Sequence, residues 1–166
     1  ADEKIAQQLI HGELTLGGEL REITVLFCDI RGFTALTQNM PPQEVIAMLN
    51  EHMTALTRVV KEHHGVLDKF VGDLLMAIFG APLPLAEPAL AAVRVALDMI
   101  ETVGMFNVER MALGKEPIRI GIGIASGEVV AGYTGTEARA TYTCIGDTVN
   151  LAARLEAHTK AAGCDI

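Results

Sequence analysis

The sequence predicts an α+β domain in which helices pack on a mostly antiparallel sheet. Strand-like and helix-like segments follow one another in the order β-α-β-β-α-β-β-α, without repeats or low-complexity tracts. Two of the strand-like segments are joined by a short turn at Gly72-Asp73, which is typical of an antiparallel hairpin. At 166 residues the chain is long enough for one domain with a single core. The order of elements resembles the split βαβ arrangement.

The elements of the first half follow from residue type and periodicity. β-branched and aromatic residues predict a buried strand over residues 23–30 (ITVLFCDI). Apolar residues at helical spacing after Pro42 predict a long amphipathic helix that ends at Gly65. The apolar stripe of this helix consists of Val45, Met48, Leu49, Met53, Leu56 and Val60. Two further strands are predicted over residues 66–70 and 74–79.

The elements of the second half are predicted in the same way. A segment rich in Ala, Val and Leu, from residue 89 to about residue 111, predicts a second long helix. The alternating glycines of residues 118–124 (IRIGIGI) predict a strand against which another element packs closely. Short strands are predicted over residues 127–132 and 142–145, and a third helix over residues 147–157.

Composition and charge narrow the class of function. A formal net charge of −8 argues against a broad surface for nucleic acid or for an anionic membrane. An acidic protein that handles phosphates needs metal ions between the two negative partners. The three cysteines are scattered and form no CxxC pair, which indicates reduced thiols in a cytoplasmic domain. No apolar run approaches the roughly 20 residues of a membrane span, so any membrane tether is expected outside these residues.

Two aspartates stand where predicted strands end. Asp29 closes the first strand and precedes Gly32, which lets the backbone approach a ligand closely. Asp73 lies at the turn of the predicted hairpin. Taken singly, Asp29 is interpreted more simply as the cap of a loop and Asp73 as part of a turn. Taken together, two strand-end carboxylates are the usual way to hold hard cations such as Mg²⁺.

Four motifs occur along the chain in a fixed order. They are FCDIRGFT (27–34), DKFVGDLLMAIFGAP (68–82), GIASGEVVAG (123–132) and IGDTVNLAARLE (145–156). In sequence and spacing they resemble the class III nucleotidyl cyclases, the family of adenylyl and guanylyl cyclases. The resemblance implies the class III cyclase fold, with a ferredoxin-like or palm-like βαββαβ core. It also implies conversion of ATP or GTP to a 3′,5′-cyclic monophosphate and pyrophosphate, in head-to-tail dimers with active sites between the two domains.

The resemblance assigns metal and phosphate contacts to the first motif and the hairpin. Asp29 and Asp73 match the two metal-binding aspartates of the family, and the carbonyl of Ile30 matches an additional ligand. Two divalent cations, Mg²⁺ or Mn²⁺, are therefore implied as cofactors. The loop that faces the phosphates matches the backbone of Gly32, Phe33 and Thr34.

Lys69 and Thr143 match the two positions that read the purine. An ammonium group only donates hydrogen bonds, so it suits the acceptor N1 of adenine, whereas guanine presents donors at this edge. A threonine hydroxyl can accept a hydrogen bond from the adenine 6-amino group. Both residues therefore favour ATP. Outside the motif, Lys69 is interpreted more simply as a solvated strand-end lysine paired with Asp68.

Asn150 and Arg154 match the N-x-x-x-R pair of the family. Because they are four residues apart on a predicted helix, both side chains project from one face. The resemblance implies that Asn150 orients the ribose and that Arg154 stabilises charge on the α-phosphate in the transition state. The simpler interpretation is an ordinary exposed helix. On either interpretation the flanking apolar residues are expected to be core, namely Val149, Leu151 and Leu155.

The resemblance also implies how the sites are built from two subunits. In the family the metal aspartates come from one subunit, and the purine-reading and transition-state residues come from the other. A homodimer of this chain is therefore expected to hold two equivalent sites, and a monomer none.

The resemblance has limits. Residues 1–18 are expected to be a linker that follows an upstream sensor or membrane domain, with a hinge at Gly17-Gly18. The catalytic domain, residues 19–166, is expected to be incomplete at its C-terminal end, because the family continues into strands that carry a triphosphate-binding lysine. Gly121 stands where mammalian-type cyclases have an arginine that contacts the polyphosphate, and Arg119 is the candidate substitute.

Three alternatives to an adenylyl cyclase are weighed. A guanylyl cyclase is argued against by Lys69 and Thr143. A diguanylate cyclase has a related fold, but its GGDEF-type signature is absent. A catalytically weak or purely regulatory cyclase-like domain would normally have lost at least one of four residues that this chain keeps. These four are Asp29, Asp73, Asn150 and Arg154.

Overall fold

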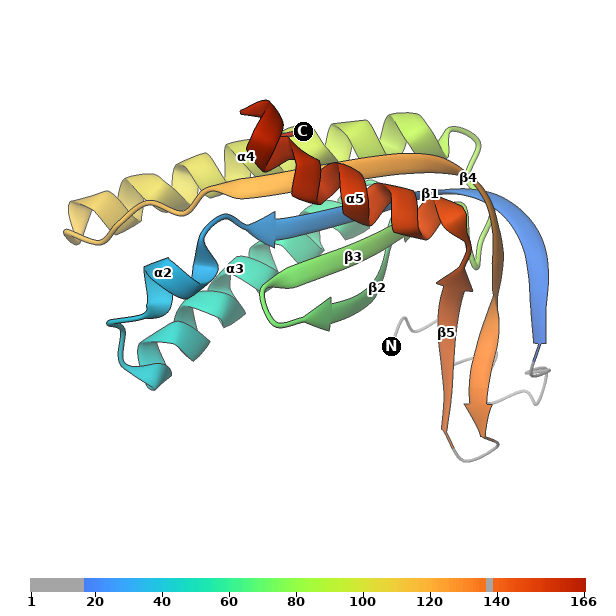
Figure 1. Ribbon diagram of the computed structural model, residues 1–166, viewed down its shortest axis with the longest axis horizontal. Helices are drawn as coiled ribbons and strands as arrows, with labels where there is room; N and C mark the ends of the chain where they lie inside the picture. Colours follow the sequence, from blue (N-terminus) through green and yellow to red (C-terminus); the bar gives the residue numbers. More distant parts are fainter. Residues whose placement is uncertain (1–16, 137–138) are drawn as a thin grey trace.

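The computed structural model of the protein describes residues 17–136 and 139–166 (Figure 1). Its elements are β1 (Gly17–Ile30), α2 (Phe33–Thr37), α3 (Pro42–Glu62), β2 (Val66–Val71), β3 (Leu74–Phe79), α4 (Pro88–Ala112), β4 (Ile120–Thr136), β5 (Arg139–Ile145) and α5 (Asp147–Ala162). This order confirms the predicted α+β class. The short helix α2 was not predicted.

The five strands form one sheet in which each neighbouring pair is antiparallel. The strand order is β2-β3-β1-β4-β5, so β1 lies at the centre and β2 and β5 lie at the edges. The first four strands have the order of a ferredoxin-like sheet, because each of the helices α3 and α4 carries the chain past a neighbouring strand. β5 extends this core beside β4.

The two faces of the sheet are covered by different helices (Figure 1). On one face, Leu26 of β1 shares a buried cluster with Leu56 of α3 and with residues of α4. On the other face, Phe27 of β1 shares a cluster with Ala152 of α5. Side chains alternate along a strand, so Asp29 points to the same side as Phe27. The first strand-end aspartate therefore lies on the face that α5 covers.

β4 is one continuous strand where two short strands were predicted. β1 pairs with β4 along its whole length, and this ladder continues through Gly127. Gly127 marks a close contact with α5 and not the start of a strand. A Cβ added to Gly127 would lie 2.6 Å from Thr148 Oγ1. The same ladder includes Gly17 and Gly18, so the predicted hinge at these residues is wrong. Residues 1–16 of the predicted linker lie outside the described residues.

The predicted close packing against the glycine-rich strand is present, and the packing element is α5. A Cβ added to Gly123 would lie 2.2 Å from the backbone nitrogen of Glu156 and 2.3 Å from the carbonyl oxygen of Ala152. A Cβ added to Gly121 would lie 2.9 Å from Thr159 Oγ1. Gly121 and Gly123 thus form a flat seat on β4, called here the α5 seat, which only residues without a side chain can provide.

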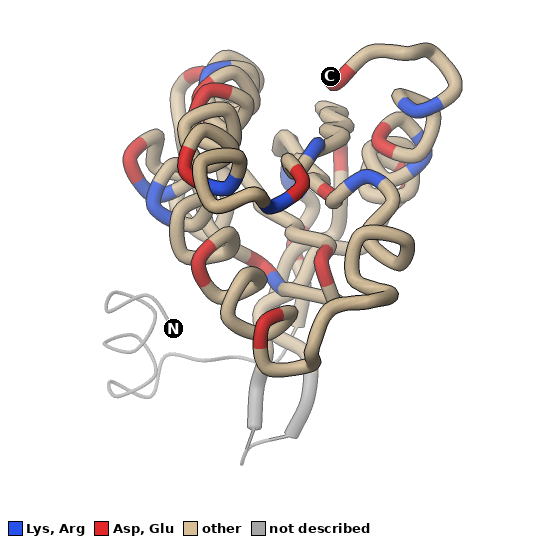
Figure 2. Tube along the Cα trace, turned by 90° about the vertical axis from the view of Figure 1, so that its left-hand side faces the viewer, with Lys and Arg blue, Asp and Glu red and all other residues tan. Residues whose placement is uncertain are grey.

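Charged residues of both signs occur on the helices in the view of Figure 2. Along the helices in this view, basic residues alternate with acidic ones. Among residues 17–136 and 139–166, no helix combines the length and the apolar composition that crossing a membrane requires.

Candidate active site

Asp29 and Asp73 come together at the end of β1. Asp29 is the penultimate residue of β1, and Asp73 lies in the turn between β2 and β3. The backbone N–H of Ile30 donates to both carboxylates, at 2.9 Å to Asp29 Oδ1 and 3.2 Å to Asp73 Oδ2. The structure therefore brings together the two aspartates that the sequence predicts as metal ligands.

Negative charge accumulates around this pair of aspartates. Partial burial, a hydrogen bond with Asp73 and the charges of Asp73 and Glu156 raise the pKa of Asp29 to about 7. Burial also raises the pKa of Glu156, which Arg31 opposes. Glu156 was not predicted as a site residue. It lies on the side of α5 that faces the sheet, four residues after Ala152, and this spacing is the signal that could have revealed it.

The donor set at the aspartates fits hard divalent cations. Two carboxylates and the carbonyl of Ile30 offer only oxygen atoms, which Mg²⁺ and Mn²⁺ prefer. Within residues 17–136 and 139–166, no group of three or more His, Cys, Asp or Glu side chains is arranged to hold a metal ion. Side chains thus supply two ligands, and backbone, water and substrate oxygens have to supply the others. A divalent cation would offset the burial and the repulsion by Asp73 and Glu156 that raise the pKa of Asp29.

The predicted phosphate-facing loop is the start of a helix. Gly32 has a left-handed backbone conformation, with a φ of 65°, and directly precedes α2. The backbone N–H groups in the first turn of a helix have no acceptor within that helix. Phe33 and Thr34 occupy this first turn, so their N–H groups can be offered to phosphate oxygens.

Lys69 lies on the α5 side of the sheet, held there by a bulge in β2. The pairing of β2 with β3 shifts between Leu67 and Lys69, so Asp68 is the extra residue. Lys69 pairs with Met76, whose side chain belongs to the cluster on the α5 face. The Asp68 carboxylate is 3.2 Å from Lys69 Nζ. The Asp68 side chain is only 2% exposed and that of Lys69 is 49% exposed, so a buried anion anchors a half-exposed ammonium.

Thr143 lies on β5, at the opposite edge of the sheet from Lys69. Cys144, the next residue of β5, belongs to the buried cluster on the α5 face together with Met76, the partner of Lys69 in β3. Side chains alternate along a strand, so Thr143 points to the other side of β5 from Cys144. No hydrogen bond joins Thr143 to Lys69 among the described residues.

Asn150 and Arg154 lie on the outer side of α5, exposed to solvent. The residues that pack inward from α5 are Val149, Ala152, Ala153, Glu156 and Thr159. Leu151 and Leu155 are 42% and 39% exposed, so the prediction that they are core is wrong, because they share the outer side with Arg154. One copy of the chain therefore does not bring Arg154 to its own aspartates.

The structure explains why residue 121 is a glycine and not an arginine. It stands opposite Asp29 in the β1–β4 ladder and belongs to the α5 seat, so an arginine side chain there would collide with α5. Arg119, the candidate substitute, is 70% exposed and lies 3.5 Å from the carboxylate of Asp165.

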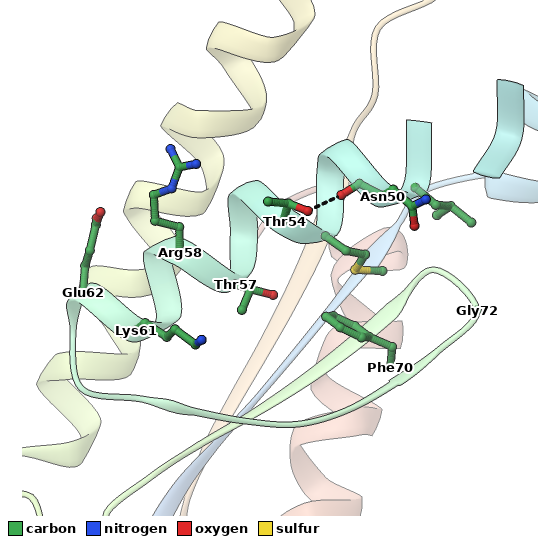
Figure 3. Close-up of a pocket in the computed structure, with 10 residues that line it drawn as sticks. Asn50, Thr54, Thr57, Arg58, Lys61, Glu62, Phe70 and Gly72 are labelled. Carbon is green, nitrogen blue, oxygen red and sulfur yellow. Dashed lines mark hydrogen bonds between the residues drawn. The ribbon is translucent and has the colours of Figure 1, made fainter. Parts of the chain in front are cut away.

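A cavity of about 790 Å³ lies between α3 and the β2–β3 hairpin (Figure 3). Phe70 points from the hairpin toward α3, where Thr54 donates a hydrogen bond of 2.6 Å to the carbonyl of Asn50. Phe70 pairs with Leu75, whose side chain belongs to the core on the α3–α4 face. Because Lys69 is on the other face, this cavity is separate from the site of the predicted residues.

Comparison with known proteins gives one consistent result. Residues 18–166 match the family described as the adenylate and guanylate cyclase catalytic domain. The chain is 38% identical over 98% of its length to a protein of Anabaena cylindrica named adenylate cyclase. A crystal structure of a guanylyl cyclase superposes with a TM-score of 0.82 at 38% identity, covering 86% of this chain and 73% of that one. The adenylyl cyclase CyaB from P. aeruginosa superposes with a TM-score of 0.81 at 34% identity, covering 86% and 74%.

The chain corresponds to one part of the curated relatives. It spans 32% of the Anabaena protein and 22% of a protein of Rhizobium meliloti named adenylate cyclase 1, to which it is 38% identical.

Proposed function

Because the chain belongs to the family of adenylate and guanylate cyclase catalytic domains, we propose that it converts ATP to 3′,5′-cyclic AMP and pyrophosphate at sites shared by two copies of the chain. The observation that carries this proposal is the convergence of Asp29 and Asp73 on the N–H of Ile30. Two partly buried carboxylates, one at the end of a strand and one in a turn, lie close enough to raise the pKa of Asp29, which supports a cation site.

In the proposed reaction the ribose 3′-oxygen attacks the α-phosphorus of ATP. The new O3′–P bond forms, the bond from the α-phosphorus to the bridging oxygen breaks, pyrophosphate leaves, and the hydroxyl proton is released. Asp29 and Asp73, with the carbonyl of Ile30, would hold two divalent cations. When bound, such cations lower the pKa of the attacking hydroxyl and neutralise phosphate charge. The backbone at Gly32, Phe33 and Thr34 would bind phosphate oxygens.

The preference for ATP rests on Lys69 and Thr143. Structural neighbours include cyclases named for each nucleotide, so the fold alone does not choose the purine. The ammonium of Lys69 donates to adenine N1, and the hydroxyl of Thr143 accepts from the 6-amino group. Guanine would present its N1–H, a donor, to the ammonium of Lys69, which is also a donor, so both groups would lack an acceptor.

The sharing of sites rests on the direction in which α5 presents its residues. Asn150 and Arg154 point away from the aspartates of their own chain, together with two exposed leucines. A second copy would receive Asn150 at the ribose and Arg154 at the α-phosphate of its bound ATP. Arg154 would then stabilise the charge that develops in the transition state.

Replacing either metal aspartate tests the reaction. We expect Asp29→Asn or Asp73→Asn to reduce cyclic AMP formation by a factor of about 10³ or more, because the cation loses half of its side-chain ligands. The readout is cyclic AMP formed from ATP with Mn²⁺, alongside thermal unfolding to establish that each variant is folded. A folded variant that retains most of its turnover would rule out the metal assignment.

Replacing Lys69 tests the nucleotide. We expect Lys69→Glu to lower kcat/KM for ATP by about tenfold to a hundredfold, with a much smaller loss for GTP, because a carboxylate accepts from guanine. Lys61→Glu, at an exposed lysine in the last turn of α3 that lines the separate cavity, makes the same change of charge away from the site. Equal losses for ATP and GTP would mean that Lys69 does not read the base.

A further inference from the structure

Arg31 ties the end of β1 to the C-terminal part of α5. Its Nε donates to the carbonyl of Ile120 at 3.1 Å, and its Nη2 donates to Thr159 Oγ1 at 2.9 Å and to the carbonyl of Cys164. Its Nε also lies 3.8 Å from the Asp165 carboxylate. The Arg31 side chain is mostly buried, and its contacts join three segments that are far apart in the sequence.

These contacts complete the attachment of α5 to the sheet. Near its start, Thr148 Oγ1 donates to the carbonyl of Glu128 at 3.1 Å. In the middle, α5 rests on Gly123 of the α5 seat. Near its end, the buried Thr159 donates to the carbonyl of Glu156 at 2.5 Å and accepts from Arg31. At the far end the backbone N–H of Ile122 also donates to the carbonyl of Asp165 at 2.8 Å, and Arg31 adds the side-chain contacts that hold Thr159 itself.

α5 transmits that orientation to the residues on its outer side. Arg154 is five residues before Thr159, about 7–8 Å along a helix, and Asn150 is about 13–14 Å away. α5 has 16 residues and is attached near both of its ends. Without the contact at Thr159 the helix can turn about its attachment at Thr148, which displaces Arg154, about 9 Å along the helix from Thr148, more than Asn150, about 3 Å away.

We propose that Arg31 is a positioning residue for the reaction, which sets the orientation of α5 and thereby of the Asn150 and Arg154 that its own subunit presents to the neighbouring one. This inference rests on the proposed function. It means that Arg31, although two residues from the metal ligand Asp29, acts mainly on the active site that does not contain that Asp29.

Mixed dimers, assembled from two different inactive variants called here the parents, allow the two sides of one shared site to be altered independently. One parent carries Asp73→Asn and still presents its α5 residues, and the other carries Asn150→Ala and Arg154→Ala and still has its aspartates. Neither homodimer has a complete site, and the mixed dimer has exactly one. Differently tagged full-length chains are expressed together and purified by both tags, and Arg31→Gln is introduced into one parent at a time.

We expect Arg31→Gln in the Asp73→Asn parent, which supplies α5, to lower kcat by about tenfold to a hundredfold with a change in KM for ATP of less than about twofold. The same substitution in the parent that supplies the aspartates should change kcat by less than about twofold. We expect kcat to fall without a matching change in KM because Arg154 acts on charge that develops only in the transition state.

Arg94→Gln is the control. Arg94 is an exposed arginine of α4, which covers the face of the sheet opposite to α5. We expect it to leave kcat within about twofold in either parent. Arg31→Lys serves as a milder variant if Arg31→Gln does not fold, because an ammonium keeps the charge without the planar fork that reaches three acceptors.

The other outcomes overturn the proposal in distinguishable ways. A loss confined to the parent that supplies the aspartates would place Arg31 at the metal or phosphate end. Equal losses in both parents, with lower thermal stability, would make Arg31 merely structural. A mixed dimer without any Arg31 substitution that shows no activity, beside an active wild type, would refute the shared sites of the proposed function and this inference with them.

Discussion

The pair formed by Asp68 and Lys69 shows how a single extra residue shapes a binding group. The β-bulge lets two consecutive residues face the same side of the sheet, and burial keeps the Asp68 carboxylate next to the ammonium. Burial also raises the pKa of Asp68, an effect that Lys69 opposes. The simpler interpretation of Lys69, a strand-end lysine paired with Asp68, is compatible with the proposed role, because the pairing leaves the ammonium half exposed.

This arrangement predicts a role for Asp68 in nucleotide use. We expect Asp68→Asn to lower kcat/KM for ATP by about tenfold, because an uncharged amide holds the Lys69 ammonium less firmly. Asp98→Asn offers a control at a carboxylate of α4 that pairs with His63. The measurement is the ratio of ATP to GTP turnover. An unchanged ratio and an unchanged kcat/KM would show that Lys69 needs no anchor.

A buried histidine predicts acid sensitivity. His52 of α3 is 3% exposed, and burial lowers its pKa to about 4, against a smaller opposing effect of Asp73. The unfolded chain takes up this proton near pH 6.5, whereas the folded protein resists it until about pH 4. The free energy of unfolding therefore falls as the pH drops through this window, by about 3 kcal/mol from this residue.

Chemical denaturation of wild type and His52→Leu at pH 7, 6, 5 and 4 measures this effect. The slope of the stability difference against pH, rather than the stability itself, is the readout. The exposed His158 provides the control variant His158→Gln. Parallel pH profiles for wild type and His52→Leu would contradict the assignment.

Residues whose proposed role depends on a single local motif could be predicted from the sequence. Asp29 and Asp73 could be predicted because strand ends and turns are local features. Glu156 and Arg31 could not be assigned, because their partners are reached only when α5 lies across β4. Leu151 and Leu155 were misplaced for a related reason: apolar residues are expected in the core unless another surface is known to cover them.

At the scale of elements, the α5 seat decides where the last helix lies. The predicted strand with alternating glycines correctly indicated a close neighbour, and the pairing of β1 along all of β4 joined two predicted strands into one. From the sequence alone, a glycine that ends a strand cannot be distinguished from a glycine that allows another element to pack closely, because glycine occurs in both situations. α2 escaped prediction because a helix of five residues has no periodicity to detect.

The seat predicts opposite effects of one substitution at two glycines. We expect Gly123→Ala to reduce the free energy of unfolding by about 3 kcal/mol, because the new methyl group meets the backbone of α5. Gly104→Ala, in the exposed part of α4 with nothing near its Cβ position, should instead add about 0.5–1 kcal/mol. Equilibrium denaturation of both variants measures this. A Gly123→Ala protein as stable as wild type would mean that α5 can lift from β4 at no cost.

At the scale of the whole molecule, the outer side of α5 predicts self-association. Leu151 and Leu155 are exposed beside Asn150 and Arg154, so a second copy is expected to cover them. We expect Leu151→Glu to shift the protein toward monomer in sedimentation and to lower specific activity by about tenfold or more at a fixed concentration. The exposed Leu97, on the opposite face, gives the control Leu97→Glu.

Specific activity of the wild type should rise with protein concentration over the range in which the dimer forms. A monomeric Leu151→Glu protein with full activity would contradict the shared site. So would a wild-type activity that does not change with dilution.

The bulge and the seat also bear on how such a domain can evolve. Lys69 and Thr143 stand at the edges of the sheet, at least partly open to solvent, where an exchange of side chain disturbs little packing. Gly121 and Gly123 allow no such exchange, because any added atom meets α5. Substitution is thus tolerated at the two positions proposed to read the base and excluded where α5 packs on the sheet. A change of nucleotide preference therefore need not disturb the packing of the domain.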